Sequence, residues 1–479
     1  MSSERVVSDF LMKRIEAVES GSKELSISES SFADWMKTLS AFGQKFLRNN
    51  DLGPAFSPIK TTDSLAGDLP LEGEPLRTSL TRFWRDALEN GVQTSSGRFF
   101  GYVPGGGLPT AAVGDFVAAL TNRYSGAYGA SPGAVEIHNT CVRWLREIVG
   151  FPEQSWGTLQ SGGSLATLTA LVAARQTRSF REWEKSVIYV GAESHLAIHK
   201  AIHISGMSCS VLRTVPVDDA YRMSTKALRE QMMKDREAGL RPWIVCATAG
   251  TTNTGAVDPL LELVELRSEI GFWLHVDGAY GGFFLLSETA KAKLRGLSEA
   301  DSLVLDPHKG LFQPYGLGAV LVRDRELLRK SMTFNASYLQ DLAVEPTGSP
   351  SDYSPELTRH FRALRLWLSF RVYGLNRFKD ALEEKILLAQ HLYSELSMVG
   401  GIEVGPEPEL SCVTFRARGE GALANEATQR MLKTLLSRGK IHLSSTRLGE
   451  FDYLRVCILS FRSHLAEVEV ALQEIKQAL

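Results

Sequence analysis

The sequence has little of what marks a membrane, secreted or nucleic-acid-binding protein. Its 479 residues contain no run of about 18 apolar residues, the length that a membrane-spanning helix requires. The first residues carry acids early and lack an unbroken apolar core, so we expect no secretory signal. Lys and Arg number 53 against 55 Asp and Glu, a formal charge of −2. Nucleic acid and anionic membranes are therefore not expected partners, because there is no net positive field to attract them.

Cysteine is scarce and scattered. The five cysteines lie far apart with no CxxC pair: Cys141, Cys209, Cys246, Cys412 and Cys457. An odd, dispersed set predicts reduced thiols rather than a disulfide framework or a zinc site. What remains is ordinary globular composition, 44% hydrophobic and 23% charged, in a chain long enough for two or three domains. We expect a soluble, cytoplasmic enzyme.

Hydrophobic patterning divides the chain into three parts. Residues 1–95 place apolar residues at three- and four-residue spacing on both sides of a loop rich in Gly, Pro, Asp and Ser, which predicts a helical N-terminal arm. Such an arm cannot bury its apolar stripe alone, so we expect it to wrap another domain or another subunit. Residues 96–360 predict a large domain, and residues 361–479 predict a small C-terminal α+β domain that begins with a long helix.

The large domain is predicted to hold a mostly parallel sheet covered on both faces, because short β-rich runs alternate with helical stretches. The predicted strands are 186–191, 209–216, 243–250, 272–278, 302–306 and 318–324. Too few residues separate the last two strands for a helix, so an antiparallel neighbour is an alternative there. In the small domain, 411–419 and 452–460 are the predicted strands.

Polar residues follow several of these strands, where ligands of parallel α/β sheets bind. Asp277 and Lys309 each follow one predicted strand, and His195 and Thr252 follow two others. Gly162-Gly163-Ser164 opens a helix whose free N–H groups and hydroxyl suit an anion. Each motif alone has low specificity; their combination is far more specific.

A metal site is not favoured. His195, His199 and His203 recur every four residues, but neighbouring histidines on a helix face are commonly solvated. No clear carboxylate partner lies on that stretch. We therefore predict no metal.

The combined motifs resemble those of the pyridoxal-phosphate (PLP) decarboxylases of the aromatic amino acid, glutamate and histidine decarboxylase group. The resemblance runs from about Phe99 to the C-terminus and implies an α/β protein of the PLP-dependent transferase fold (fold type I, aspartate aminotransferase-like). It also implies pyridoxal 5'-phosphate as cofactor and a homodimer with shared active sites. The motifs follow the family's order: S-G-G-S-x-A-T at 161–167, His195, G-T-T at 250–252, H-V-D-x-A-Y at 275–280 and D-P-H-K at 306–309.

The resemblance implies a role for each site residue. Lys309 would carry PLP covalently, so its amine must be able to lose a proton. Asp277 would bind the pyridine N1–H, and its negative charge would keep the ring protonated, which makes the ring a better electron sink. His195 would stack over the ring and lie close to the substrate. The other implied cofactor contacts are Gly163 and Ser164 at the phosphate, Thr252 and Ala279 along the ring, and His308 beside the lysine.

One tyrosine is implied to decide the reaction type. Residues 337–357 are polar and aperiodic, which predicts a mobile lid. The matching loop of the aromatic decarboxylases carries a tyrosine that protonates the substrate carbon. Tyr353 is the predicted equivalent, and Tyr338 aligns with an earlier tyrosine of the same loop. Tyrosine rather than phenylalanine at the catalytic position favours simple decarboxylation over aldehyde synthesis.

Other positions bear on the substrate. Residues 98–104 resemble the pocket segment of the aromatic enzymes, in which Tyr102 matches a substrate-binding tyrosine. The segment continues into Gly105-Gly106-Gly107, where relatives carry bulkier residues, and we expect these glycines to widen the pocket or loosen its wall. Asp306 stands where some relatives have Asn, and an acid near a phosphate is unfavourable unless it faces elsewhere. His138 stands where a family Glu is expected.

The predicted function is PLP-dependent decarboxylation of an L-amino acid, with an aromatic one as the best choice, to the amine and CO₂. Two alternatives stay open. The first is an aldehyde synthase or carbon–carbon lyase of the same fold. The second is a catalytically silent PLP-fold binding protein, against which the intact Lys309, Asp277 and His195 argue. A nicotinamide dehydrogenase is disfavoured, because no GxGxxG follows an early strand.

Overall fold

The structure, a computed structural model, describes residues 3–59, 65–333 and 348–479. The chain forms two compact units, one made of Met1–Gly53 with Ser57–Gly91 and the other of Pro54–Phe56 with Val92–Leu479. Within the described residues, no helix is both long and apolar enough to cross a membrane.

The first unit is helical. The Ser28 side chain caps its second helix by accepting a hydrogen bond from Ser31 N (3.1 Å). Phe42 meets the Trp84 ring edge-on, with centroids 5.2 Å apart, and so joins the second helix to the turn after the third. Its elements are α1 (Ser3–Lys23), α2 (Glu29–Leu52), α3 (Leu76–Phe83) and the π-helical turn η1 (Trp84–Leu88), and the short strands where the chain passes from unit to unit are β1 (Phe56–Ser57) and β2 (Gly91–Val92).

The second unit contains a seven-stranded sheet. β9 is antiparallel to both of its neighbours, and the remaining strand pairs are parallel. The expected mostly parallel sheet is confirmed, as is the antiparallel neighbour at its last predicted strand. The strand order is β3 (Trp156–Gln160), β9 (Gly318–Val322), β8 (Ser302–Leu305), β7 (Trp273–Asp277), β6 (Arg241–Thr248), β4 (Ser186–Gly191) and β5 (Val211–Val215).

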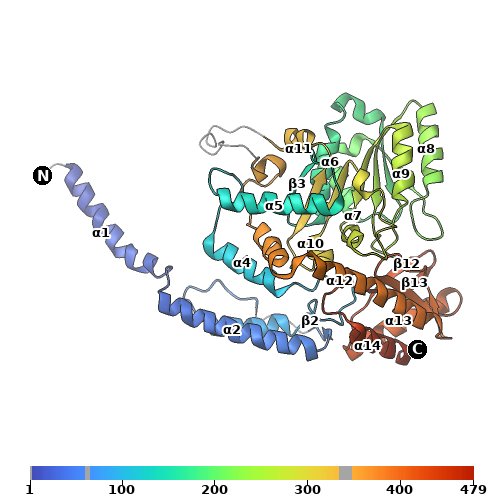
Figure 1. Cartoon of the computed structure of the whole chain (residues 1–479). Coiled ribbons are helices and arrows are strands. Elements are labelled where there is room, and N and C mark those ends of the chain that lie inside the picture. Colours follow the sequence, from blue (N-terminus) through green and yellow to red (C-terminus); the bar gives the residue numbers. More distant parts are fainter. Residues whose placement is uncertain (1–2, 60–64, 334–347) are drawn as a thin grey trace. The chain divides into compact units, whose positions relative to one another are not determined.

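Helices surround this sheet (Figure 1). The longest, α12, departs from helical geometry at Gly374, where φ is +69° and ψ is 163°. The helices of the second unit are α4 (Pro109–Thr121), α5 (Pro132–Val149), α6 (Gly163–Arg175), α7 (Leu196–Ile204), α8 (Thr225–Glu237), α9 (Leu260–Ile270), α10 (Pro307–Gly310), α11 (Arg325–Met332), α12 (Ala363–Ser397), α13 (Gly421–Arg438) and α14 (Leu465–Gln477). Its short helical turns are η2 (Phe180–Lys185), η3 (Met207–Cys209), η4 (Gly282–Leu286), η5 (Leu297–Glu299) and η7 (Pro350–Tyr353).

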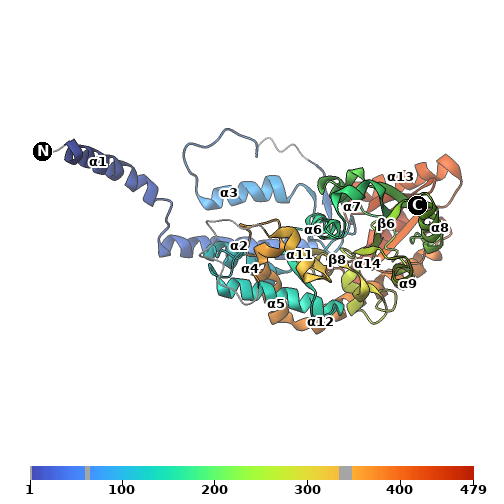
Figure 2. The same cartoon turned by 90° about the horizontal axis from the view of Figure 1, so that it is seen from above.

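Both faces of the large sheet are buried, because successive residues of a strand point to opposite sides. Ile188 and Val190 of β4 pack in one cluster with apolar residues of α6 and α7. The alternate residues, Val187 and Tyr189, belong to a second cluster with residues of α8 and α9. The view from above shows α6 and α7 on one side of the strands and α9 on the other (Figure 2). The sheet is therefore held rigidly from both sides.

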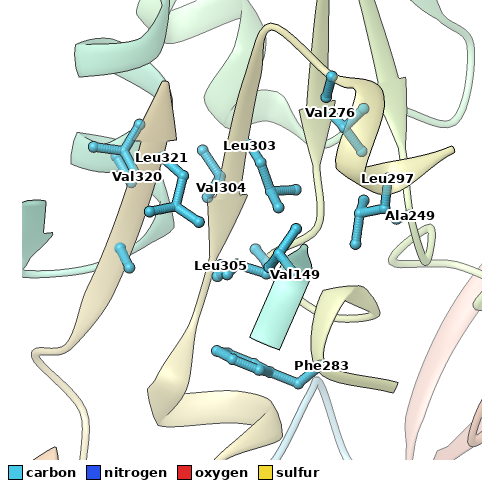
Figure 3. Close-up of a cluster of buried hydrophobic side chains, with 14 of the residues drawn as sticks. Val149, Ala249, Val276, Phe283, Leu297, Leu303, Val304, Leu305, Val320 and Leu321 are labelled. Atoms are coloured by element: carbon cyan, nitrogen blue, oxygen red, sulfur yellow. The ribbon is translucent and has the colours of Figure 1, made fainter. Parts of the chain in front are cut away.

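The centre of the large sheet is the main core. Leu303 and Leu305 of β8 and Val276 of β7 are fully buried there, together with Phe283 from the turn that follows β7 (Figure 3). Burying each side chain of this size stabilises the fold by about 1.5–3 kcal/mol. These strands consequently fix the backbone positions from which the loops at their carboxyl ends depart.

A four-stranded antiparallel sheet forms from the C-terminal residues, with a core of its own. α13 and α14 contribute Met431, Leu435, Val468 and Leu472 to that core. The strand order is β10 (Ile402–Val404), β11 (Cys412–Ala417), β13 (Phe451–Cys457) and β12 (Ser444–Leu448). The predicted α+β character of this region is thus observed.

Candidate active site

The carboxyl ends of β3, β4, β6, β7 and β8 lie at one edge of the large sheet, because these strands run in the same direction. A cavity of about 360 Å³ opens at that edge. Every cofactor-binding residue predicted from the sequence lines it: Gly163, Ser164, His195, Thr252, Asp277, Ala279, His308 and Lys309. The sheet topology therefore brings together residues that are far apart in the chain.

Lys309 is held by an acid of the same motif. It lies in the single helical turn α10, which follows β8, and its Nζ is 3.2 Å from Oδ2 of Asp306. Asp306 is buried, and its Oδ1 has no hydrogen-bond partner among the described residues. The neighbouring His308 uses Nδ1 to contact Leu317 O at 2.8 Å. The Asp306 carboxylate thus faces Lys309 and also lies against the start of α6.

The N-terminus of α6 opens into the cavity. The helix begins just after β3 at the extended residue Gly162, and no side chain caps it within the described part of the chain. The first N–H groups of a helix have no partner inside the helix, so this end offers hydrogen-bond donors and a positive dipole to an anion. A Cβ added to Gly163 would lie 2.8 Å from Asp306 Oδ2, so glycine lets α6 approach β8.

Asp277 ends β7 in a buried position beside the cavity. Its Oδ1 accepts a hydrogen bond from Ala279 N (3.0 Å), which fixes the carboxylate. His275, on the same face of the strand, is fully buried, and its Nδ1 lies 2.9 Å from Oγ of Ser302. Burial lowers the pKa of His275 to about 4, against a smaller opposing effect of Asp277. His275 is therefore neutral at pH 7 and places no positive charge beside Asp277.

His195 lies at the start of α7. Its Nδ1 accepts a hydrogen bond from Ala197 N (3.2 Å), so in the neutral ring the proton is on Nε2. Thr252 is an exposed residue of the loop after β6. Asn253 anchors that loop, donating to Oε2 of Glu193 and accepting from Oγ1 of Thr446, both at 2.7 Å. The two loops that carry His195 and Thr252 are thereby tied together.

Tyr102 does not line the cavity. Its side chain is 65% exposed, its φ is +54°, and its carbonyl accepts a hydrogen bond from Arg455 (2.6 Å). Its ring centroid is 6.2 Å from that of Phe99 and 6.4 Å from that of His442. Tyr102 is thus exposed and lies outside the lining of this cavity, and its contact with a substrate stays a prediction.

The structure also bears on the glycines at 105–107, which were expected to widen the pocket or loosen its wall. A Cβ added to Gly105 would overlap the carbonyl oxygen of His308, and Gly106 and Gly107 have φ of +85° and +69°. Gly105 lets the chain pass directly against the turn that carries Lys309, whereas Gly106 lies against Ser460 and Phe461. At Gly105 the wall is tight rather than loose, and a wider pocket stays a prediction.

Tyr353 is a core residue. It is 1% exposed, its hydroxyl accepts a hydrogen bond from Nε of Arg325 (2.8 Å), and its ring lies 6.2 Å from that of Trp156. This position contradicts the prediction that Tyr353 is the proton donor of a mobile lid, because the side chain would have to leave the core to reach a substrate. Tyr338, like the rest of 334–347, lies outside the described residues.

His138 has a structural role. It is buried on α5, and its Nε2 lies 3.5 Å from Oγ1 of Thr158. Burial, together with the charges of Arg359 and Arg362, holds the pKa of His138 well below its usual range. His138 is consequently a neutral residue of the core and does not line the cavity.

The sequence predicted some of the residues that line the cavity and missed others. Asp306 and Tyr280 belong to motifs already recognised, so their position in those motifs was a usable signal. Thr248 ends β6, two positions before the predicted glycine-threonine loop. The lining residues that were not predicted as site residues are Ser161, Gly162, Leu165, Thr167, Ala197, Thr248, Gly250, Tyr280 and Asp306.

These residues fit pyridoxal phosphate. The uncapped N-terminus of α6 suits the phosphate, the carboxylate of Asp277 suits a protonated ring nitrogen, and Lys309 is an amine that can bond to an aldehyde. All three border one cavity.

Comparison with known proteins gives the same result. The family described as "Pyridoxal-dependent decarboxylase conserved domain" matches residues 60–418. An aromatic-L-amino-acid decarboxylase of Bacillus atrophaeus is 35% identical over 420 residues, covering 86% of this chain and 88% of the relative. An L-2,4-diaminobutyrate decarboxylase of Acinetobacter baumannii is 26% identical over 503 residues, covering 98% of both.

Solved structures share the fold. The crystal structure of Catharanthus roseus tryptophan decarboxylase in complex with L-tryptophan superposes with a TM-score of 0.86 at 23% identity, covering 95% of this chain and 99% of that one. Oryza sativa TDC with PLP and tryptamine gives a TM-score of 0.88 at 24% identity, covering 94% and 98%. The PLP-dependent fold type I is therefore confirmed. The chain belongs to the pyridoxal-dependent decarboxylase family and is a PLP-dependent carboxy-lyase.

Proposed function

We propose that this enzyme removes the carboxyl group of an aromatic L-amino acid and releases the amine and CO₂. The observation that carries the proposal is the meeting of Lys309, Asp277 and the N-terminus of α6 around one cavity. The aromatic preference is supported by the 35% identity to an aromatic-L-amino-acid decarboxylase. The diaminobutyrate enzyme, which matches over more of the chain at lower identity, makes the side chain of the substrate the point to test.

Each residue has a task that follows from its position. Bound PLP supplies an electron sink for the bond that breaks. Asp277 would hold the proton on the ring nitrogen, while Ser164 and the N–H groups of α6 would fix the phosphate. Asp306 Oδ2, 3.2 Å from Nζ of Lys309, would stabilise the amine whenever it is protonated. His195, with its proton on Nε2, would cover the ring face and orient the substrate.

The substrate carbon must regain a proton after CO₂ leaves. Tyr353 does not serve this purpose, because it is buried and bonded to Arg325. We propose Tyr338, the other tyrosine that aligns with the family's loop, as the donor. His195 is the second candidate, since it lines the cavity and carries an N–H proton.

Aldehyde synthesis is the alternative reaction. A phenylacetaldehyde synthase of Petunia hybrida is 28% identical over 406 residues, covering 80% of both chains. The two reactions share the loss of CO₂ and differ in product: decarboxylation gives an amine, and aldehyde synthesis gives an aldehyde with ammonia. Product analysis therefore separates them.

We further propose a homodimer, supported by an apolar stripe on α4. Val113, Phe116, Val117 and Leu120 are 57%, 39%, 36% and 57% exposed and follow the spacing of one helix face. A contiguous exposed apolar stripe is typical of a protein interface. Sedimentation should show a dimer that the change Phe116→Glu shifts toward monomer. A wild-type monomer would contradict the proposal.

The central test is a screen of amino acids for CO₂ release by the PLP-loaded enzyme. We expect release from an aromatic amino acid with one equivalent of amine. CO₂ release from diaminobutyrate alone would contradict the proposed aromatic substrate. An aldehyde with ammonia as the products would contradict the proposed decarboxylation to an amine. Borohydride reduction followed by peptide mapping should place the cofactor label on Lys309. Lys309→Ala should lose both label and turnover, whereas Lys291→Ala, a change at an exposed lysine, should lose neither.

A further inference from the structure

Two cysteines far apart in the chain stand opposite each other in the small sheet. Cys412 of β11 is the register partner of Cys457 of β13 in an antiparallel pair, so both side chains project from the same face. Cys457 N donates to Phe100 O instead of to Cys412, and Ile458 N donates to Ser411 O. The two cysteines therefore form a non-hydrogen-bonded pair.

This pairing has the dimensions of a disulfide. The Cα atoms of a non-hydrogen-bonded antiparallel pair lie about 4.5 Å apart, inside the range of about 4.4–6.8 Å that disulfides span. Both thiols are buried, with Cys412 1% and Cys457 0% exposed. The sequence alone suggested five unrelated thiols; the sheet register makes two of them neighbours.

A buried arginine stands beside the pair. Arg455 is two residues before Cys457 on β13, shares its face of the sheet, and is 4% exposed. Its side chain donates to Ser444 Oγ (2.9 Å) and Tyr102 O (2.6 Å). Its Nε has no hydrogen-bond partner among the described residues.

A buried cation is costly unless it is paired, and a thiolate at Cys412 would supply a negative charge beside it. The neighbouring Cys457 thiol and the charge of Arg455 lower the pKa of the Cys412 thiol, against the opposing effect of burial. Burial raises the pKa of Cys457 well above its usual value. We therefore take Cys412 as the attacking thiol and Cys457 as the resolving one, an order that the single variants test.

We propose that Cys412 and Cys457 are an oxidisable dithiol that hydrogen peroxide closes to a disulfide behind the wall of the cofactor cavity. The Cys412 thiolate attacks one peroxide oxygen, the O–O bond breaks, and the sulfur becomes a sulfenic acid while hydroxide leaves and takes up a proton. The Cys457 thiol then displaces the sulfenic hydroxyl as water. Together the thiols lose two electrons and two protons, and one peroxide becomes two waters.

The dithiol touches the structure that supports the cavity. The Cys412 thiol donates a weak hydrogen bond to Asn253 O (3.8 Å), in the loop that carries Thr252. A Cβ added to Gly255 would lie 3.1 Å from Cys412 Cβ and 3.6 Å from the ring of Tyr280, a cavity-lining residue. Drawing the Cys412 sulfur toward Cys457 changes these contacts, so we expect oxidised protein to retain PLP less well.

The test treats the PLP-loaded full chain with peroxide, blocks remaining thiols by alkylation and maps peptides by mass spectrometry. We expect a cross-linked peptide pair joining Cys412 to Cys457, which dithiothreitol releases. Cys209, which is exposed, and the buried Cys141 and Cys246, whose pKa values are raised by burial, are internal controls. Oxidation of Cys209 with no cross-link between Cys412 and Cys457 would overturn the proposal.

Single variants separate the two thiols. Cys457→Ser should trap a sulfenic acid on Cys412 that dimedone labels, and Cys412→Ser should leave Cys457 unlabelled. Arg455→Met should slow cross-linking on the order of tenfold, the effect of one pKa unit on the thiolate fraction, and Arg455→Lys should restore part of the rate. Equal labelling in both cysteine variants would overturn the assignment of the nucleophile.

The link to the cavity has its own readout. After peroxide treatment and desalting, wild-type protein should retain less PLP than the untreated protein, and dithiothreitol followed by PLP should restore it. The double change C412S with C457S should retain PLP equally with and without peroxide. A disulfide that forms with no change in PLP retention would overturn the coupling. None of these measurements needs a substrate, so they stand or fall separately from the proposed reaction.

Discussion

The edge of the large sheet and the segments around it use their side chains differently. At the edge, short local links fix each polar group and leave it beside the cavity: Ala279 N holds Asp277, and Ala197 N holds His195. In the surrounding segments, long-range contacts occupy the groups. Tyr353 binds Arg325 across 28 positions of chain, and the Tyr102 carbonyl binds Arg455 across 353. The first kind of contact leaves chemistry available, and the second braces the fold.

The largest effect on turnover is expected when the Asp277 carboxylate is removed. If the carboxylate at the end of β7 holds a charge on the cofactor ring, Asp277→Ala should reduce turnover at least ~10³-fold, about 4 kcal/mol of transition-state stabilisation. Decarboxylation rates under PLP saturation measure this, with urea unfolding as a check that the fold is kept. A loss of only twofold would show that the protonated ring is not required.

The same distinction, between groups available for chemistry and groups that stabilise the fold, applies to Tyr338 and Tyr353. Tyr338→Phe should slow turnover on the order of 10²-fold and move the product from amine toward aldehyde, since it removes a proposed proton donor. Tyr353→Phe should keep rate and product but lower the free energy of unfolding by about 1–2 kcal/mol, because the Arg325 hydrogen bond is lost. If Tyr353→Phe changes the product and Tyr338→Phe does not, the assignment is reversed.

Gly105 tests how much a close contact between distant segments of the chain matters for stability. Gly105→Ala should lower the free energy of unfolding by about 1–3 kcal/mol, because the new methyl group overlaps the carbonyl oxygen of His308. Gly107→Ala is the matched control: its Cβ would meet nothing nearer than Pro314 Cα at 3.9 Å, which leaves only the strain of φ +69°. Gly107→Ala measures the cost of backbone strain alone, and no loss of stability in Gly105→Ala by urea unfolding would show that contact with the Lys309 turn costs nothing.

The same distinction explains what the sequence could predict. The predicted strand 186–191 matches β4 at both ends, because an apolar β-rich run bounded by turns is stable as a buried strand of a sheet. β3 was not predicted, since its buried face includes polar residues such as Gln160, whose amide donates to Thr169 Oγ1 at 2.6 Å. That partner is set by tertiary packing and leaves no apolar pattern in the strand itself.

The site follows the same rule. The residues of the cavity that stand next to strand ends were predictable, because topology alone brings strand ends together. The positions of Tyr102, Tyr353 and the glycines at 105–107 depend on distant partners, which no local pattern specifies. The pairing of Cys412 with Cys457 likewise depends on the register of β11 against β13.

The smallest effect is expected at His275. It lies two residues from Asp277 on the same strand face, yet it is fully buried. Its pKa in the folded protein, about 4, is below the ordinary value of 6.5, so folding excludes a proton that the unfolded chain accepts. The stability that neutral His275 contributes is therefore complete above pH 6.5 and is lost as the pH falls toward 4, by about 1.4 kcal/mol per pH unit. His275→Gln should lose this slope and keep a polar group for Ser302. Urea unfolding of both proteins at several pH values measures the difference, in which His138 cancels because it is present in both. Parallel stability curves would show that His275 takes up a proton equally well in the folded and unfolded chains.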